Sequence, residues 1–180
     1  MKLYVSPRAP NPRRVQMFLA EKGIDLGAQG IELVNVDLNA QEHKSAAFRA
    51  KSPLARIPAL ELDDGRVLTE TRAICTYLEG LHPEPNLMGH DATERAFIEM
   101  ADRRVEWYFL LPIANCVRHT HPGLAPLEQP QFPEFGRSQG EKLRETAAWL
   151  DGELQRQPWV AGERFSIADI TAFCALEFAK

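Results

Sequence analysis

A proline at the start of a short apolar run most constrains how this chain folds. The run spans residues 56–60 (RIPAL), and the Asp-Asp-Gly sequence at 63–65 is typical of a hairpin turn. Because proline donates no hydrogen bond to a β-ladder, Pro58 cannot lie inside a central strand. It can begin one, where a cis bond after Ile57 leaves the backbone groups of Ile57 free and pointing outward. The sequence therefore predicts a hairpin whose first strand presents unpaired backbone groups.

A helix is expected to begin directly after the second strand of this hairpin, at Glu70 and Thr71, and to run to about Leu81. The unpaired N–H groups and the dipole of a helix N-terminus favour an anion, whereas the Glu70 carboxylate suits a cation. Together with the backbone of Ile57, these residues predict a docking site for a peptide-like ligand that carries both charges.

The rest of the first half reads as alternating strands and helices. Expected elements are a strand at 3–5, a breaker-rich loop at 6–10, a helix at 12–23 with Asn11 as its N-cap, a buried strand at 31–38 and a short polar helix at 41–50. This order predicts an α/β unit, βαβ-α-ββα, with a mixed four-stranded sheet and helices on its faces.

The second half has no strand pattern. We expect a domain at 1–82, a proline-broken linker at 83–90 and an all-helical domain at 91–180, whose first helix is interrupted near Pro112. A second helix is expected at 135–156, and the proline-rich loop before it is a candidate lid. Ser166 and Asp169 form a capping box for a last helix, a folding device with no catalytic role. The chain stops inside that helix, so we expect the sequence to be truncated at its C-terminus.

Composition narrows the class of protein. The chain has 180 residues, 44% of them hydrophobic, and a net charge of −4, which argues against a general nucleic-acid binder. It contains no apolar run long enough to span a bilayer and no N-terminal signal segment, so a cytoplasmic location is expected. The three cysteines are far apart and sit among apolar residues, which predicts small core residues and no metal site.

The order and spacing of these motifs resemble the cytosolic glutathione transferases. That family shares the strand start at 57–60, the hairpin and a following Glu-Ser, which is Glu70-Thr71 here, and it shares the capping motif at 165–170. The resemblance implies a thioredoxin-like glutathione-binding domain, a helical C-terminal domain and a homodimer. It also implies a detoxification enzyme that conjugates glutathione, as cosubstrate and without a metal, to a small hydrophobic electrophile.

The resemblance assigns roles to residues of the hairpin region. Glu70 would bind the ammonium group of glutathione, Thr71 its γ-glutamyl carboxylate, and the backbone of Ile57 beside Pro58 its cysteinyl part. The candidates for its glycine carboxylate are Arg56, Lys44 and His43.

The loop after the first strand offers two candidates for the residue that stabilises the thiolate. The loop after the first strand has Ala9 and Pro10 where other classes have serine or cysteine, and Asn11 resembles the asparagine of nu-class enzymes. An asparagine N–H at a helix N-terminus can lower the pKa of a thiol, although Asn11 can equally be an ordinary N-cap. Ser6 is the reserve candidate.

Other assignments stay open at this point. Arg103, Trp107 and Tyr108 are candidates for the hydrophobic-substrate site, and aromatic residues at helical spacing are also common in cores. Two alternative functions are a glutathione-dependent disulfide reductase or peroxidase of nu type and a non-catalytic interaction module. The expected dimer would use charged and apolar positions on two helices, Ile74 and Phe97 among them.

Overall fold

A computed structural model describes residues 1–7 and 9–180 of the chain and divides it into two compact units, Met1–Pro85 and Asn86–Lys180. The elements of the first unit are β1 (Lys2–Val5), α1 (Pro10–Glu21), β2 (Glu32–Asn35), the short 3₁₀ helix η1 (Glu42–Lys44), α2 (Ala46–Arg49), β3 (Ala59–Glu61), β4 (Val67–Thr69) and α3 (Thr71–Leu81). The predicted order of strands and helices is confirmed.

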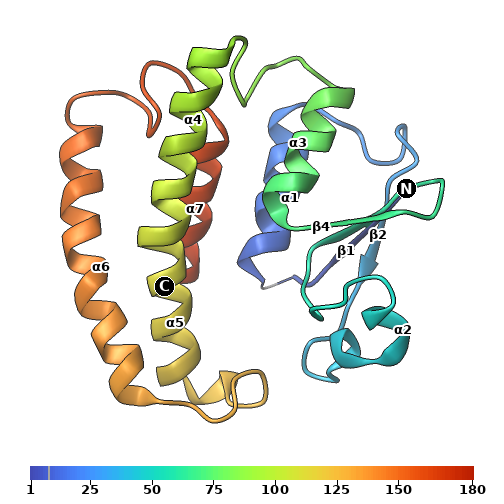
Figure 1. Cartoon of the computed structure of the whole chain (residues 1–180), viewed down its shortest axis with the longest axis horizontal. Coiled ribbons are helices and arrows are strands. Elements are labelled where there is room, and N and C mark those ends of the chain that lie inside the picture. The colour runs from blue at the N-terminus through green and yellow to red at the C-terminus, as the bar shows by residue number, and fades with distance from the viewer. Residues whose placement is uncertain (8) are drawn as a thin grey trace. The chain divides into compact units, whose positions relative to one another are not determined.

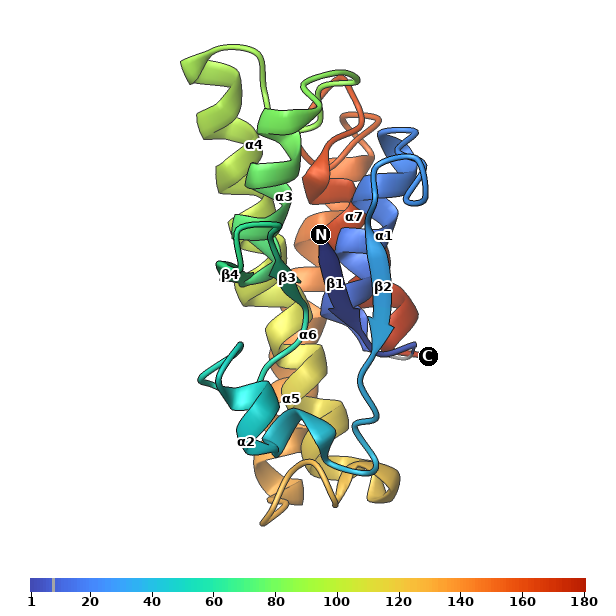
Figure 2. The same ribbon diagram turned by 90° about the vertical axis from the view of Figure 1, so that its right-hand side faces the viewer.

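The sheet has the order β2-β1-β3-β4 (Figure 2). β1 pairs in parallel with β2 and antiparallel with β3, and β3 pairs antiparallel with β4. The sheet is therefore mixed, as predicted. α1 and α3 lie together on one face (Figure 1), whereas Phe48 of α2 packs with Tyr4, Val36 and Ala59 on the other.

Two expectations for the first unit are wrong. β2 is an edge strand and not a buried one, since Leu33 is 42% exposed and only the flanking Ile31 and Val36 are buried. α1 begins at Pro10, with Ala9 as its N-cap, so Asn11 lies inside the first turn and is not the cap. Proline is well suited to the first helical position, and the helix therefore begins at Pro10, two residues earlier in the chain than expected.

The second unit is helical, with α4 (Ala92–Val105), the π-helical segment η2 (Glu106–Leu110), α5 (Leu111–Thr120), the 3₁₀ helix η3 (Pro122–Leu124), α6 (Pro133–Leu154) and α7 (Ile167–Phe178). The expected interruption near Pro112 is confirmed as η2, which ends at Leu110, two residues before Pro112. Pro112 has no N–H to donate to the carbonyl of Tyr108, and the helix widens there by one residue.

The core of this unit is formed by apolar residues of α4, η2, α5, α6 and α7, with Val105, Phe109 and Ile113 near its centre. α5 and α6 pack closely because α6 presents glycine to α5: a Cβ on Gly136 would lie 2.7 Å from the Thr120 methyl group. Ser166 and Asp169 form the predicted capping box at the start of α7. None of the helices within residues 1–7 and 9–180 is long and apolar enough to cross a membrane.

Candidate functional site

The strand directions bring the candidate residues of the first unit to one end of the sheet. β1 and β4 end there, and β3, which is antiparallel to both, begins there. The loop after β1 leads into Asn11, β3 is preceded by Ile57 and Pro58, and β4 is followed by Glu70 and Thr71. β2 is parallel to β1, so the segment that follows it, with His43 and Lys44 in η1, leaves the sheet at the same end.

The strand start has the predicted form. The peptide bond between Ile57 and Pro58 is cis, and within the described chain the amide and carbonyl of Ile57 have no hydrogen-bond partner. β3 itself begins at Ala59, which pairs with Tyr4 on one side and with Thr69 on the other. Ile57 thus lies just before the start of β3, at the end of the sheet, with backbone groups that an extended peptide can pair with.

Glu70 has a strained backbone. It occupies the N-cap position of α3 with φ 66°, in the left-handed region that favours glycine, and its side chain makes no cap hydrogen bond. Its carboxylate is exposed and forms no ion pair among the residues that the structure describes. Strain of this kind costs on the order of 1–3 kcal/mol and is concentrated at ligand sites. A capping role of the Glu70 side chain therefore does not explain this strain.

Thr71 begins α3 and is buried, and its hydroxyl donates to the backbone carbonyl of Asn11 at 3.5 Å. This contact joins the N-termini of α1 and α3. The first turn of α3 lies at this end of the sheet, and the N–H groups that begin a helix are the groups that an anion would bind.

Asn11 lies in the first turn of α1, between two prolines that have no N–H group. Pro10 and Pro12 have no N–H, and the amide of Arg13 donates to Ala9, so Asn11 has the one backbone N–H of residues 10–12, and it has no hydrogen-bond partner among residues 1–7 and 9–180. The side chain of Asn11 is exposed, and its Oδ1 accepts a hydrogen bond from Arg14 at 3.3 Å. Ser6, the reserve candidate, is half-buried, and its carbonyl accepts from Ala9.

A phenol, an amine and a carboxylate form a second polar cluster on this unit. Tyr4 and Lys51 both donate to Glu61 Oε2 at 2.6 Å. The hydrogen bond from Lys51 lowers the pKa of Glu61, and burial, followed by the bond to Glu61, raises the pKa of Tyr4. The cluster fixes the segment after α2 to the sheet, which is a structural role.

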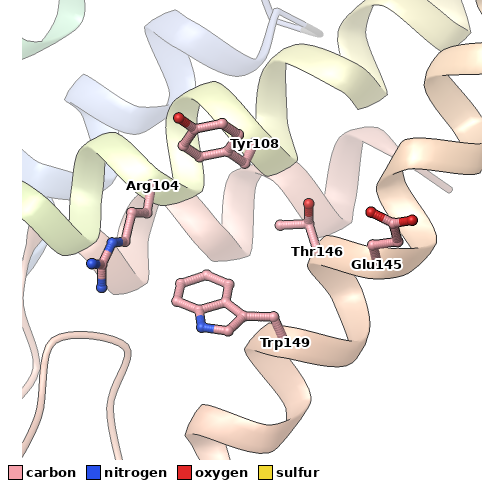
Figure 3. Close-up of a pocket in the computed structure, with 5 residues that line it drawn as sticks. All are labelled: Arg104, Tyr108, Glu145, Thr146 and Trp149. Atoms are coloured by element: carbon pink, nitrogen blue, oxygen red, sulfur yellow. The ribbon is translucent and has the colours of Figure 1, made fainter.

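The helical unit contains a pocket of about 440 Å³ between α4 and α6. Figure 3 shows Arg104 and Tyr108 on one wall, facing Glu145, Thr146 and Trp149 of α6 on the other. Of the candidates for the hydrophobic-substrate site, Tyr108 lines this pocket but Trp107 and Arg103 do not. Arg103 is held by the carboxylates of Asp102 and Glu106.

Sequence reasoning missed two buried cations, one in α1 and one at the C-cap of this helix. Arg14 is 1% exposed, and Lys22 donates at 2.7 Å both to Glu79 and to the carbonyl of Pro85. The signal was present, because both residues lie three or four positions from the buried Phe18 or Leu19 and so on the same face of the helix. No group of three His, Cys, Asp or Glu side chains suited to a metal ion occurs in the described part of the chain.

Comparison with known proteins matches this chain to one family along most of its length. Residues 3–86 match the model of the glutathione S-transferase N-terminal domain, and residues 113–180 match that of the C-terminal domain. Glutathione S-transferase 2 of Saccharomyces cerevisiae is 37% identical over 99% of this chain and 76% of the relative. The maleylacetoacetate isomerase of Pseudomonas aeruginosa is 38% identical over 94% of this chain and 77% of the relative.

Solved structures agree with this match. The crystal structure of a glutathione S-transferase domain-containing protein from Marinobacter aquaeolei superposes with a TM-score of 0.93 at 40% identity, over 99% of this chain and 86% of that one. The chain therefore belongs to the glutathione S-transferase family.

Proposed function

We propose that this chain is a glutathione transferase that binds glutathione at the end of its sheet and joins the sulfur to a hydrophobic electrophile. The observation that carries the proposal is the unpaired backbone of Ile57 next to the strained, exposed Glu70 and the N-terminus of α3. These three features suit an extended peptide with an ammonium group and a carboxylate at one end.

Each part of glutathione has a partner in this arrangement. The Ile57 backbone pairs with the cysteinyl residue, Glu70 binds the ammonium group, and the N–H groups of Thr71 and the following turn bind the γ-glutamyl carboxylate. The glycine carboxylate is assigned to a cation from Arg56, Lys44 or His43, which lie on the segments entering and leaving the same end of the sheet.

Asn11 is assigned to the sulfur. Its backbone and side-chain N–H groups are donors at the start of a helix, and they stabilise a thiolate more than a thiol. The thiol proton passes to solvent, and the thiolate then forms the carbon–sulfur bond. With a chloronitrobenzene as electrophile, chloride leaves with the electron pair of the carbon–chlorine bond. The chain contributes activation of the thiol and proximity of the two reactants.

The activity test uses purified protein with glutathione and either a chloronitrobenzene or a model disulfide. Conjugation that exceeds the uncatalysed rate and falls with Asn11→Ala supports the transferase. Faster reduction of the disulfide would favour the alternative of a glutathione-dependent reductase, which the lack of a loop cysteine between residues 6 and 11 also fits. A protein that binds no glutathione and accelerates neither reaction would contradict the proposal.

We further propose that two copies of the chain associate through the aromatic face of the helical unit, defined by Phe97, Met100, Tyr108, Leu111 and Trp149. These side chains are exposed, Phe97 by 59% and Tyr108 by 64%, and such a patch is typical of an interface. Ile74, which the sequence suggested for the interface, is fully buried and is excluded from it.

Two charges on this face suit a two-fold contact. Arg104 and Glu145 line the same pocket, and neither forms an ion pair within residues 1–7 and 9–180. In a two-fold interface, a contact between one residue of the first copy and a different residue of the second copy occurs again with the two copies exchanged. Arg104 of each copy can therefore pair with Glu145 of the other copy, which gives two equivalent ion pairs.

Charge exchange tests this assembly. Arg104→Glu should convert the dimer to a particle of about 20 kDa, the mass of one chain, and the double variant with Glu145→Arg should restore it. Light scattering at micromolar concentration measures both. A wild-type protein that is monomeric under these conditions would contradict the dimer.

A further inference from the structure

Asn11 is held by a buried arginine. Arg14 lies one turn further along α1, only 1% of it is exposed, and its Nη1 donates to Asn11 Oδ1 at 3.3 Å. Burial of a guanidinium is costly unless its N–H groups find acceptors, so a side chain placed this way is firmly fixed.

The contact determines which end of the Asn11 carboxamide faces outward. The group is planar, with its oxygen and its NH₂ on opposite sides of one carbon atom. Because the oxygen is directed at Arg14, the two N–H groups are directed away from it. The backbone of the same residue is fixed by the hydrogen bond from Thr71 to its carbonyl. An exposed asparagine without these contacts would rotate and turn over freely.

The orientation matters because a thiolate is stabilised by N–H donors and repelled by an amide oxygen. We propose that Arg14 is a positioning residue, which holds the Asn11 carboxamide so that its N–H groups face the sulfur of glutathione. This inference rests on the glutathione site proposed above.

The alternative is that Arg14 only stabilises the fold. A structural residue would change the free energy of unfolding, but it would leave the acidity of bound glutathione unchanged. The two roles are therefore separated by the thiol pKa of bound glutathione, measured from the ultraviolet absorbance of the thiolate as a function of pH.

The experiment is a double-mutant cycle on the full chain, with Arg14→Gln, Asn11→Ala and the double variant. Arg14→Gln should raise the thiol pKa of bound glutathione by about one pH unit, because the thiolate loses oriented donors. Asn11→Ala should raise it as much, and adding Arg14→Gln to Asn11→Ala should change nothing more. The matched control is Arg13→Gln, which removes the exposed neighbouring arginine and should leave the thiol pKa unchanged.

Additive rises in the double variant would overturn the inference, since Arg14 would then act on the sulfur independently of Asn11. An unchanged thiol pKa in Arg14→Gln would also overturn it. S-methylglutathione, which has no thiol proton, should bind to the Arg13→Gln control as tightly as to the wild-type protein, as measured by calorimetry. If the wild-type protein binds neither this compound nor glutathione, it is the proposed function that fails.

Two further measurements cover the case in which Arg14→Gln does not fold. Arg14→Lys keeps the positive charge but not the planar fork, and it should raise the thiol pKa in the same direction. In the wild-type protein, the side-chain N–H resonances of Asn11 should shift when glutathione is added and should titrate with its thiol. Resonances that do not move would overturn the inference without any variant.

Discussion

The hydroxyl of Ser52 bridges both backbone groups of Arg56: it donates to the Arg56 carbonyl at 2.8 Å and accepts from the Arg56 amide at 3.1 Å. Ser52 is buried, and Ala55 between the two residues has φ 54°, a conformation that favours glycine. The Ser52 side chain thus holds a strained turn closed. The residue directly after this turn is Ile57, whose backbone is assigned to glutathione.

Ser52→Ala should therefore weaken glutathione binding without removing any group that touches the ligand. Loss of two hydrogen bonds should destabilise the chain by about 1–2 kcal/mol and raise the Kd for glutathione by roughly three- to tenfold. Calorimetry measures the Kd, and urea unfolding measures the stability. Ser138→Ala, which removes a hydroxyl bonded to the Phe135 carbonyl of α6, is the control and should leave the Kd unchanged. A Kd in Ser52→Ala equal to that of the wild type would contradict this role.

The close packing of α5 on α6 predicts opposite effects for two glycine substitutions on the same helix. Gly136→Ala would bring a methyl group within 2.7 Å of Thr120 and 3.1 Å of His119, so it should destabilise the chain by about 1–3 kcal/mol. Gly152→Ala meets nothing within 4 Å and should stabilise α6 by up to about 1 kcal/mol. Urea unfolding of both variants tests the packing, and equal effects would contradict it.

The elements that local chemistry determines were predicted from the sequence. The strand start at Pro58, the hairpin turn at 63–65 and the capping box of Ser166 and Asp169 depend on residues close in sequence, and all three occur in the structure. The edge position of β2 could not be predicted, because it depends on which strands pair. Likewise Pro112 indicates a break in the helix, but not that the break is a π-helical turn.

The buried charged residues of the first unit were not predicted from the sequence. Arg14 and Lys22 were absent from the sequence prediction because charged residues on a helix are usually exposed. The spacing from Phe18 placed both on the apolar face, and only the tertiary partners explain why they are tolerated there. The roles of Asn11 and of Glu70 remain predictions, since they concern a ligand.

Acid should weaken the helical unit through one carboxylate. Hydrogen bonds from Arg164 and from the His90 amide lower the pKa of Glu94 from 4.5 to about 2. Between these values the unfolded chain binds more protons than the folded one, so the contribution of Glu94 is complete above pH 4.5 and is lost as the pH falls to about 2.

The variant Glu94→Gln isolates this contribution. Both Glu94 and Arg164 are about one-third exposed, so the contribution at neutral pH should be about 1 kcal/mol. Urea unfolding between pH 7 and pH 2 should show a difference from the wild type that disappears in acid. Glu141→Gln, on the exposed side of α6, should follow the wild-type curve. A difference that persists unchanged into acid would contradict the assignment.

The central claim is that the end of the sheet binds glutathione through Ile57, Glu70 and Thr71. Calorimetric titration with glutathione tests this claim most directly. The wild-type chain should bind one glutathione per chain with a Kd below one millimolar, and Glu70→Gln, which removes the partner of the ammonium group, should raise the Kd about tenfold or more. Absence of binding by the wild-type chain at millimolar glutathione, or equal affinity in Glu70→Gln, would contradict the account.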